Sequence, residues 1–133
     1  MGDYILNEID KIGILLRGIL RKLKLIKENP EELSVEDTKQ ELVEKLNIDM
    51  DELLAKDDFI RILVEEHEFD EPSMELFAEV LADMAFAAER VEDRHRFGAA
   101  ACEIYKFQDA RHAPASFNRY YILKELARLD QEE

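Results

Sequence analysis

Residues 1–28 carry the clearest pattern of hydrophobic and polar positions in this chain. Apolar side chains recur there at alternating steps of four and three, at Ile5, Ile9, Ile12, Leu16, Ile19, Leu23 and Ile26. This spacing places them on one face of an α-helix. We therefore predict a long amphipathic helix over residues 3–28. Its apolar face needs a partner surface, either in the rest of the chain or in a second copy.

The rest of the chain repeats the helical period in shorter stretches. Ser34 and Asp37 resemble a capping box, and Asp70-Glu71-Pro72 is typical of a helix start because acidic groups and proline favour the first turn. No stretch alternates in the way typical of a β-strand, so the predicted fold class is all-α, with six or seven helices. We predict these helices over residues 35–46, 51–54, 59–67, 73–92, 95–109 and 116–129, with turns at 92–95 and 111–115 and with Ser116 capping the last helix.

The charge of the chain is strongly negative and unevenly distributed. The 133 residues are 47% hydrophobic and 38% charged, which is typical of one folded domain, and the net charge is −14. Residues 1–27 nevertheless contain six basic side chains against three acidic ones. The acidic remainder repels nucleic acid and favours basic partners. Three roles remain open for the basic end of the first helix. It could pack against this acidic body, pair with another copy, or lie on an anionic membrane surface.

The chain shows no sign of an oxidising compartment or a membrane span. It contains one cysteine, Cys102, so an intramolecular disulfide is impossible. The N-terminus has acidic residues before its apolar stretch and no small-residue cleavage site, which is unlike a signal peptide. The apolar stretch is interrupted by Asp10, Lys11 and Arg17, which is unlike a spanning helix. We therefore expect a cytoplasmic protein.

The C-terminal half carries features of a known helical repeat. Ala101 followed by Tyr105 forms a small-then-aromatic pair, and Pro114 follows at a repeat-like distance. With these features the stretch from Glu71 to Leu129 resembles tetratricopeptide-type repeats. The resemblance implies antiparallel helical hairpins stacked as an α-α superhelix. The chain departs from the repeat in lacking its Leu-Gly pair and in having a longer first helix.

The whole chain also resembles a small family of uncharacterised bacterial proteins. The resemblance rests on four features: an opening Asp3-Tyr4-Ile5, a basic end to the first helix, a Met50-Asp51-Glu52-Leu53-Leu54 turn, and a closing Arg119-Tyr120-Tyr121 helix. It implies an all-helical fold and carries no known activity.

Three groups of residues were considered for catalysis or metal binding. Glu92 and His95 have the Glu-x-x-His spacing of carboxylate di-iron bundles, but His67 has Val64 at the matching position, so the second pair is missing. His67 follows two glutamates near a helix end, where the helix dipole favours a histidine. Cys102 has no close basic neighbour to activate its thiol. We predict no catalytic residue, no metal and no cofactor.

Basic and aromatic side chains bracket the last predicted turn. Arg119 and Tyr120 follow it, together with Tyr121, and Arg111 and His112 precede it. Such a group is suited to hold a phosphate, a carboxylate or a peptide tail. The alternative is that Tyr120 or Tyr121 belongs to the core and that Arg119 pairs with surface acids.

These observations favour a protein-interaction or scaffold module without catalysis. We predict a dimerisation or docking helix over residues 1–28 and an acidic helical domain over 29–133, tetratricopeptide-like from about residue 71. The predicted contacts with a protein partner or a second copy, in a homodimer, are Ile5, Ile9, Ile12, Leu16, Ile19, Leu23, Arg119 and Tyr120. The alternatives are a membrane-surface protein, or an enzyme whose pocket joins His95, His112 or Glu89.

Overall fold

The computed structural model describes residues 2–28 and 34–131, with side chains described for residues 11–26, 28 and 34–131. Within these residues the chain forms helices and turns without a β-strand, which confirms the predicted all-α class. Seven helices are present in the described part: α1 (Gly2–Glu28), α2 (Val35–Leu46), α3 (Met50–Leu54), α4 (Phe59–Glu65), α5 (Glu71–Ala87), α6 (Val91–Ala110) and α7 (Arg119–Gln131).

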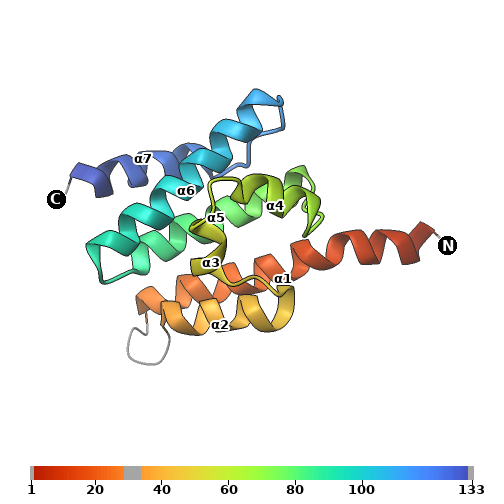
Figure 1. Cartoon of the computed structure of the whole chain (residues 1–133), viewed down its shortest axis with the longest axis horizontal. Coiled ribbons are helices and arrows are strands. Elements are labelled where there is room, and N and C mark those ends of the chain that lie inside the picture. Colours follow the sequence, from red (N-terminus) through yellow and green to blue (C-terminus); the bar gives the residue numbers. More distant parts are fainter. Residues whose placement is uncertain (1, 29–33, 132–133) are drawn as a thin grey trace.

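Helix α5 is the centre of the fold. Helix α6 packs along one side of it and α1 along another, while α7 lies against both α5 and α6 (Figure 1). Helix α2 packs on α1, and the short helices α3 and α4 lead the chain from α2 back to α5. Accordingly most of α5 is buried, including Phe77, Val80 and Met84, which are fully enclosed.

The apolar face of α1 is buried in the core of the same chain from Leu16 onward. Five of its side chains are at most 8% exposed: Leu16, Ile19, Leu20, Leu23 and Ile26. Ile12 is half-buried and packs against the edge of the same core. The side chains of Ile5 and Ile9 lie outside the described residues. The C-terminal part of the predicted apolar face is therefore buried within a single molecule.

Local capping explains where several helices begin and end. Ser34 and Asp37 form the predicted capping box of α2, with both reciprocal hydrogen bonds present. Asn47 ends α2 in the left-handed conformation, which asparagine tolerates better than most residues. The Asp70 side chain accepts a hydrogen bond from the Ser73 N–H at 2.9 Å and caps α5, as the acidic start signal predicts.

The junction between α5 and α6 differs from the predicted one. The predicted helices at residues 73–92 and 95–109 place the turn at 92–95, which is wrong because α5 ends at Ala87 and α6 begins at Val91. Ala88 is extended, and the Arg94 side chain donates to the carbonyl oxygens of Ala88 and Glu89 at 2.9 and 3.3 Å. A side chain from the first turn of α6 thus holds a turn in a stretch of good helix formers.

The start of α7 also corrects the sequence prediction. Ser116 does not cap the helix, which begins at Arg119. Its hydroxyl is buried without a hydrogen-bond partner among the described residues. Its backbone N–H donates instead to Glu75 of α5 at 2.9 Å. The turn before α7 is therefore held by a hydrogen bond to α5, and Ser116 does not act as a helix cap.

Candidate functional site

Three aromatic side chains are exposed at the start of α7. The exposed fractions of Phe117, Tyr120 and Tyr121 are 94%, 69% and 63%, and the two tyrosine rings meet edge to face at 5.4 Å. Single exposed apolar residues are common, but neighbouring ones in a patch are typical of a binding surface. We call these three residues the aromatic patch. The alternative prediction that Tyr120 or Tyr121 belongs to the core is wrong.

A buried ion pair lies beneath the aromatic patch. The Arg119 guanidinium donates two hydrogen bonds to the Glu75 carboxylate, at 2.9 and 2.7 Å, and both residues are 6% exposed. Another nitrogen of Arg119 pairs with Asp109 at the surface. The predicted pairing of Arg119 with surface acids therefore holds for Asp109, whereas Glu75 is a buried partner.

Gln108 completes this buried polar cluster. Its side-chain N–H groups donate to the Glu71 carbonyl oxygen at 2.8 Å and to Glu75 at 3.3 Å. Its amide oxygen accepts two hydrogen bonds from Arg111, at 2.9 and 2.6 Å. The end of α6, the following turn and the start of α5 are thus linked. Glu75 and Gln108 were not predicted from the sequence as members of this cluster. Each is a polar residue at a core position of an otherwise apolar helix face, and this pattern could have indicated them.

The pKa of Glu75 makes the stability of this cluster depend on pH. Burial alone would raise that pKa, but hydrogen bonds from Arg119, the Ser116 N–H and Gln108 hold it below the ordinary value of 4.5. Because the pKa is lower in the folded state, the stabilisation is complete above the unfolded pKa and is lost as the pH falls through the folded pKa.

We therefore expect the free energy of unfolding to decrease below about pH 4.5, and to decrease less steeply in Glu75→Gln. Urea denaturation followed by circular dichroism at several pH values measures this slope. Glu103→Gln, at an exposed position on α6, is the matched control. Equal slopes in the wild-type chain and Glu75→Gln would contradict the assignment.

The basic side chains of α1 pair with acidic groups of the helices beside it. Lys22 contacts the Glu41 carboxylate on α2 at 2.9 Å, and Lys24 contacts Glu79 and Asp83 on α5, each at 3.2 Å. Burial opposes the charge of Lys24, but Asp83 and Glu79 outweigh it and raise the pKa of Lys24. Part of the basic end of α1 thus packs against the acidic body, which was one of the open alternatives.

An open hollow lies between α1, α5 and the turn before α7. It has a volume of about 310 Å³ and is lined partly by the apolar groups of Pro72, Leu76 and Pro114. Arg17 lines it from α1, and Ser116 lines it next to the aromatic patch. Apolar lining of this kind is suited to an apolar side chain of a partner.

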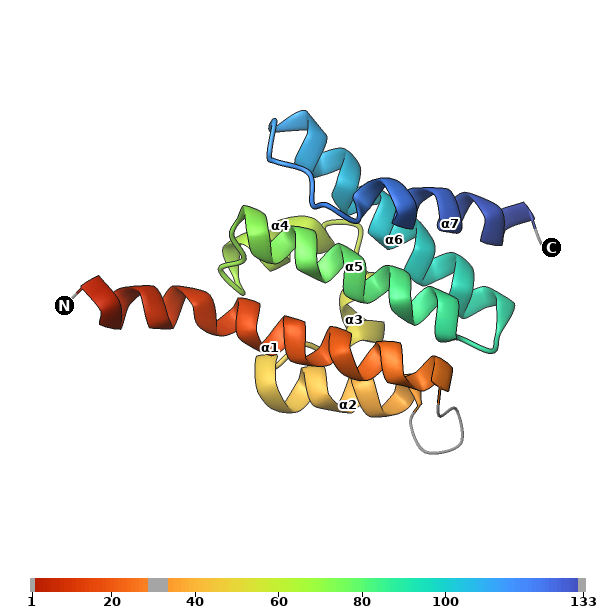
Figure 2. The ribbon, with the colours of Figure 1, turned by 180° about the vertical axis from the view of Figure 1, so that it is seen from behind.

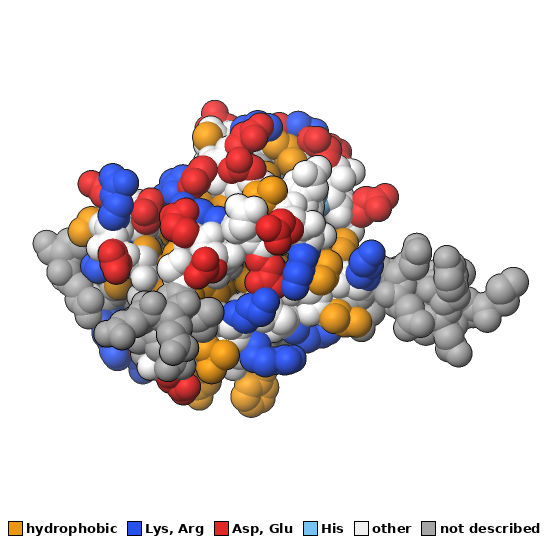
Figure 3. Space-filling view, turned by 90° about the horizontal axis from the view of Figure 1, so that it is seen from below, with side chains coloured by type: hydrophobic (Ala, Val, Ile, Leu, Met, Phe, Trp, Pro, Cys, Tyr) orange, Lys and Arg blue, Asp and Glu red, His pale blue; other side chains and the backbone are white. Residues whose placement is uncertain are grey.

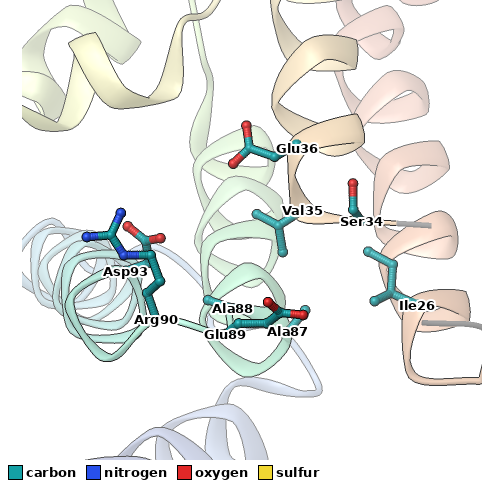
Figure 4. Close-up of a pocket in the computed structure, with 9 residues that line it drawn as sticks. All are labelled: Ile26, Ser34, Val35, Glu36, Ala87, Ala88, Glu89, Arg90 and Asp93. Atoms are coloured by element: carbon teal, nitrogen blue, oxygen red, sulfur yellow. The ribbon is translucent and has the colours of Figure 1, made fainter. Parts of the chain in front are cut away.

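A second hollow of about 260 Å³ lies where α1, α2 and the α5–α6 turn meet (Figure 4). Its floor is formed by Ile26, Val35 and Ala87, and its rim carries carboxylates. The charged side chains of Glu36, Glu89, Arg90 and Asp93 are spread around the hollow rather than converging on one point. This arrangement does not assemble an acid, a base and a nucleophile.

The candidate catalytic residues lie apart. Glu92 and His95 occupy the first turns of α6, where both are exposed, and His95 lies 3.8 Å from Asp130 of α7. His112 is at the opposite end of α6, and Glu89 lines the other hollow. Among the described residues, no three acidic, histidine or cysteine side chains are grouped as metal ligands.

Cys102 lies on α6 in a half-buried position. Burial and the nearby Asp130 carboxylate raise the pKa of its thiol. A raised pKa keeps the thiol protonated at neutral pH, which is the opposite of what a nucleophilic cysteine needs.

Comparisons with known proteins give no relative of this chain: no family model matches it, and no curated protein or solved structure is similar to it. In the described part of the chain, no helix is both long enough and apolar enough to span a bilayer.

Proposed function

We propose that this protein is an interaction or scaffold module that forms a homodimer through the N-terminal part of α1. The observation that carries the proposal is the different environment of the two ends of this helix. The C-terminal part packs in the core of its own chain through Leu16, Ile19 and Leu23. The N-terminal part extends past the ends of the other helices (Figure 2).

The apolar pattern continues into the part that extends. Ile5 and Ile9 continue the alternating steps of four and three that also place Leu16 and Leu23 on the apolar face, and Leu6 follows Ile5 in the sequence. A helix with an apolar face gains about 25 cal/mol for each Å² of that face removed from water. A second copy of the chain can supply the surface that covers this face, and two-fold symmetry then repeats the contact.

The C-terminal helices supply a second surface for partners. We propose that α5, α6 and α7 form a tetratricopeptide-like hairpin stack, which is supported by the packing of α7 against both members of the α5–α6 pair. Tyr120 is exposed on this stack as a contact residue. Arg119 is buried beneath it, so in this proposal it positions the contact surface through Glu75 and Asp109.

The distribution of charge supports protein partners rather than nucleic acid. In a view toward α1 and α2, basic side chains gather in the middle of the face, and acidic side chains are scattered among other types over the rest of it (Figure 3). With a net charge of −14, the protein repels polyanions and attracts basic protein surfaces at long range. The proposed activity requires no cofactor.

Light scattering on the full chain tests the self-association. We expect a dimer in the wild-type chain and a folded monomer in the double variant Ile5→Ser, Ile9→Ser, because polar side chains remove the apolar contact. Val91→Ser is the control, since Val91 is 46% exposed at the start of α6, far from the N-terminal part of α1 (Figure 1). A wild-type chain that stays monomeric at high concentration, or a double variant that dimerises normally, would overturn the proposal.

A further inference from the structure

We infer that the aromatic patch receives the N-terminal part of α1 from a second copy of the chain. This inference rests on the proposed self-association through α1. It adds the surface on which that helix docks, Phe117, Tyr120 and Tyr121, and makes the contact reciprocal.

The two surfaces cannot meet within one molecule. The buried Leu16 and Leu23 hold the C-terminal part of α1 in the core, so the direction of the whole helix is set. Its N-terminal part points away from the body, whereas α7 lies on the far side of α5 and runs toward the opposite end of the molecule (Figure 1, Figure 2). A contact between the two surfaces therefore requires two molecules.

The two surfaces are both apolar in residue type. Phe117 lies in the turn just before α7, Tyr120 and Tyr121 lie in the first turn of α7, and all three side chains are exposed. The N-terminal part of α1 carries the aliphatic residues Ile5 and Ile9 at a step of four. Aromatic rings on one surface and branched aliphatic side chains on the other are a common pair in buried helix contacts.

The hollow lined by Ser116, the residue before Phe117 in the sequence, extends the proposed docking surface. Ser116 and Pro114 line it from the turn, and Pro72 and Leu76 line it from α5. Its volume of about 310 Å³ accommodates an apolar side chain of the incoming helix. The surface thus combines exposed rings with an adjacent recess, the combination that interface anchors occupy.

The charges favour α1 as the occupant. Beyond the aromatic patch, α7 exposes Lys124 and Arg128, the latter 3.3 Å from Glu125. The N-terminal part of α1 contains only acidic charges before residue 11: Asp3, Glu8 and Asp10. Packing α1 on α7 brings these acidic residues toward the exposed Lys124, which carries the opposite charge. Reciprocal docking closes a two-fold dimer.

The first test changes the patch in the full chain. In Phe117→Ser, Tyr121→Ser we expect the dimer dissociation constant, measured by analytical ultracentrifugation, to rise at least about tenfold. The exposed side chains leave the core untouched, so the circular dichroism spectrum stays that of the wild type. Val43→Ser, Val91→Ser is the matched control, because these residues are 41% and 46% exposed elsewhere on the surface.

The second test identifies the occupant. The photoreactive residue p-benzoyl-phenylalanine replaces Phe117, and mixed dimers of isotope-labelled and unlabelled chains are irradiated. We expect intermolecular cross-links to peptides that contain residues 2–11. Cross-links to residues 117–128 of the second copy, or a dimer without any cross-link, would overturn the inference.

The outcomes separate the inference from the proposed function. If Ile5→Ser, Ile9→Ser breaks the dimer while Phe117→Ser, Tyr121→Ser leaves it intact, self-association through α1 stands and docking on the aromatic patch is wrong. If the wild-type chain is a monomer at all concentrations, both are wrong.

Discussion

Replacing Arg119 with methionine is expected to lower the free energy of unfolding by about 3–5 kcal/mol. The substitution removes both hydrogen bonds to Glu75 and leaves a carboxylate that is 6% exposed without its counter-charge. The Asp109 contact is lost as well, although Asp109 is exposed and regains water. Urea denaturation at pH 7 followed by circular dichroism measures the change.

Two further variants show whether the cost comes from the buried charge. Arg128→Met removes a surface pair with Glu125, and we expect it to cost less than about 1 kcal/mol. Adding Glu75→Met to Arg119→Met removes the unpaired carboxylate, so the double variant should be more stable than Arg119→Met alone. A cost of less than about 1 kcal/mol for Arg119→Met would contradict the role assigned to the pair.

Replacing Leu16 with alanine is expected to lower the free energy of unfolding by about 2–5 kcal/mol. Leu16 is 0% exposed and faces the core formed with α5 and α2, so the shorter side chain leaves a cavity and loses apolar contacts. Thermal and urea denaturation of the full chain measure the loss. Ile14→Ala, at a position that is 59% exposed two residues away, should change stability by less than about 0.5 kcal/mol.

The Leu16→Ala variant also distinguishes the two proposed roles of α1, which are packing in the core and dimerisation. A destabilised variant that still dimerises assigns Leu16 to the core and leaves the N-terminal part of α1 for the partner. A variant of unchanged stability that no longer dimerises would show instead that the C-terminal part of the apolar face of α1 is an intermolecular contact.

The apolar face of α1 and the starts of α2 and α5 were predictable because the sequence patterns that indicate them are local. The apolar period of α1, the capping box at Ser34 and Asp37, and the acidic start at Asp70 each involve residues within one or a few turns of helix. Neighbouring residues decide such features, so reading the sequence recovers them. The aromatic residues near the last turn were also recognised from their positions in the sequence.

The break between α5 and α6 was not predictable in this way. Ala87, Ala88, Glu89 and Arg90 are acceptable helix residues, and neither glycine nor proline marks the end of α5. The turn forms where α6 must reverse direction to pack on α5, and the Arg94 side chain satisfies the freed carbonyl groups. Residues 92–93 then supply acidic groups to the first turn of α6.

The exposure of Tyr120 and Tyr121 and the burial of Glu75 follow from the rotation of helices about their axes. Sequence pattern shows which residues share a helix face, but α7 has two faces with apolar side chains. Only the packing of α7 on α5 and α6 decides that Ile122 and Leu126 point inward and the tyrosines outward. Glu75 becomes buried because Arg119, 44 residues later, arrives opposite to it.

The sequence by itself determined the helical class of this protein, the length and apolar face of its first helix, its acidic charge and the capped starts of α2 and α5, because short-range periodicity and capping chemistry control these features. The tertiary structure alone decided how far the face of α1 is buried, where α5 turns into α6, and which polar groups of α5, α6 and α7 meet. These features depend on contacts between residues distant in the chain, whose free energy is realised only after the helices have packed.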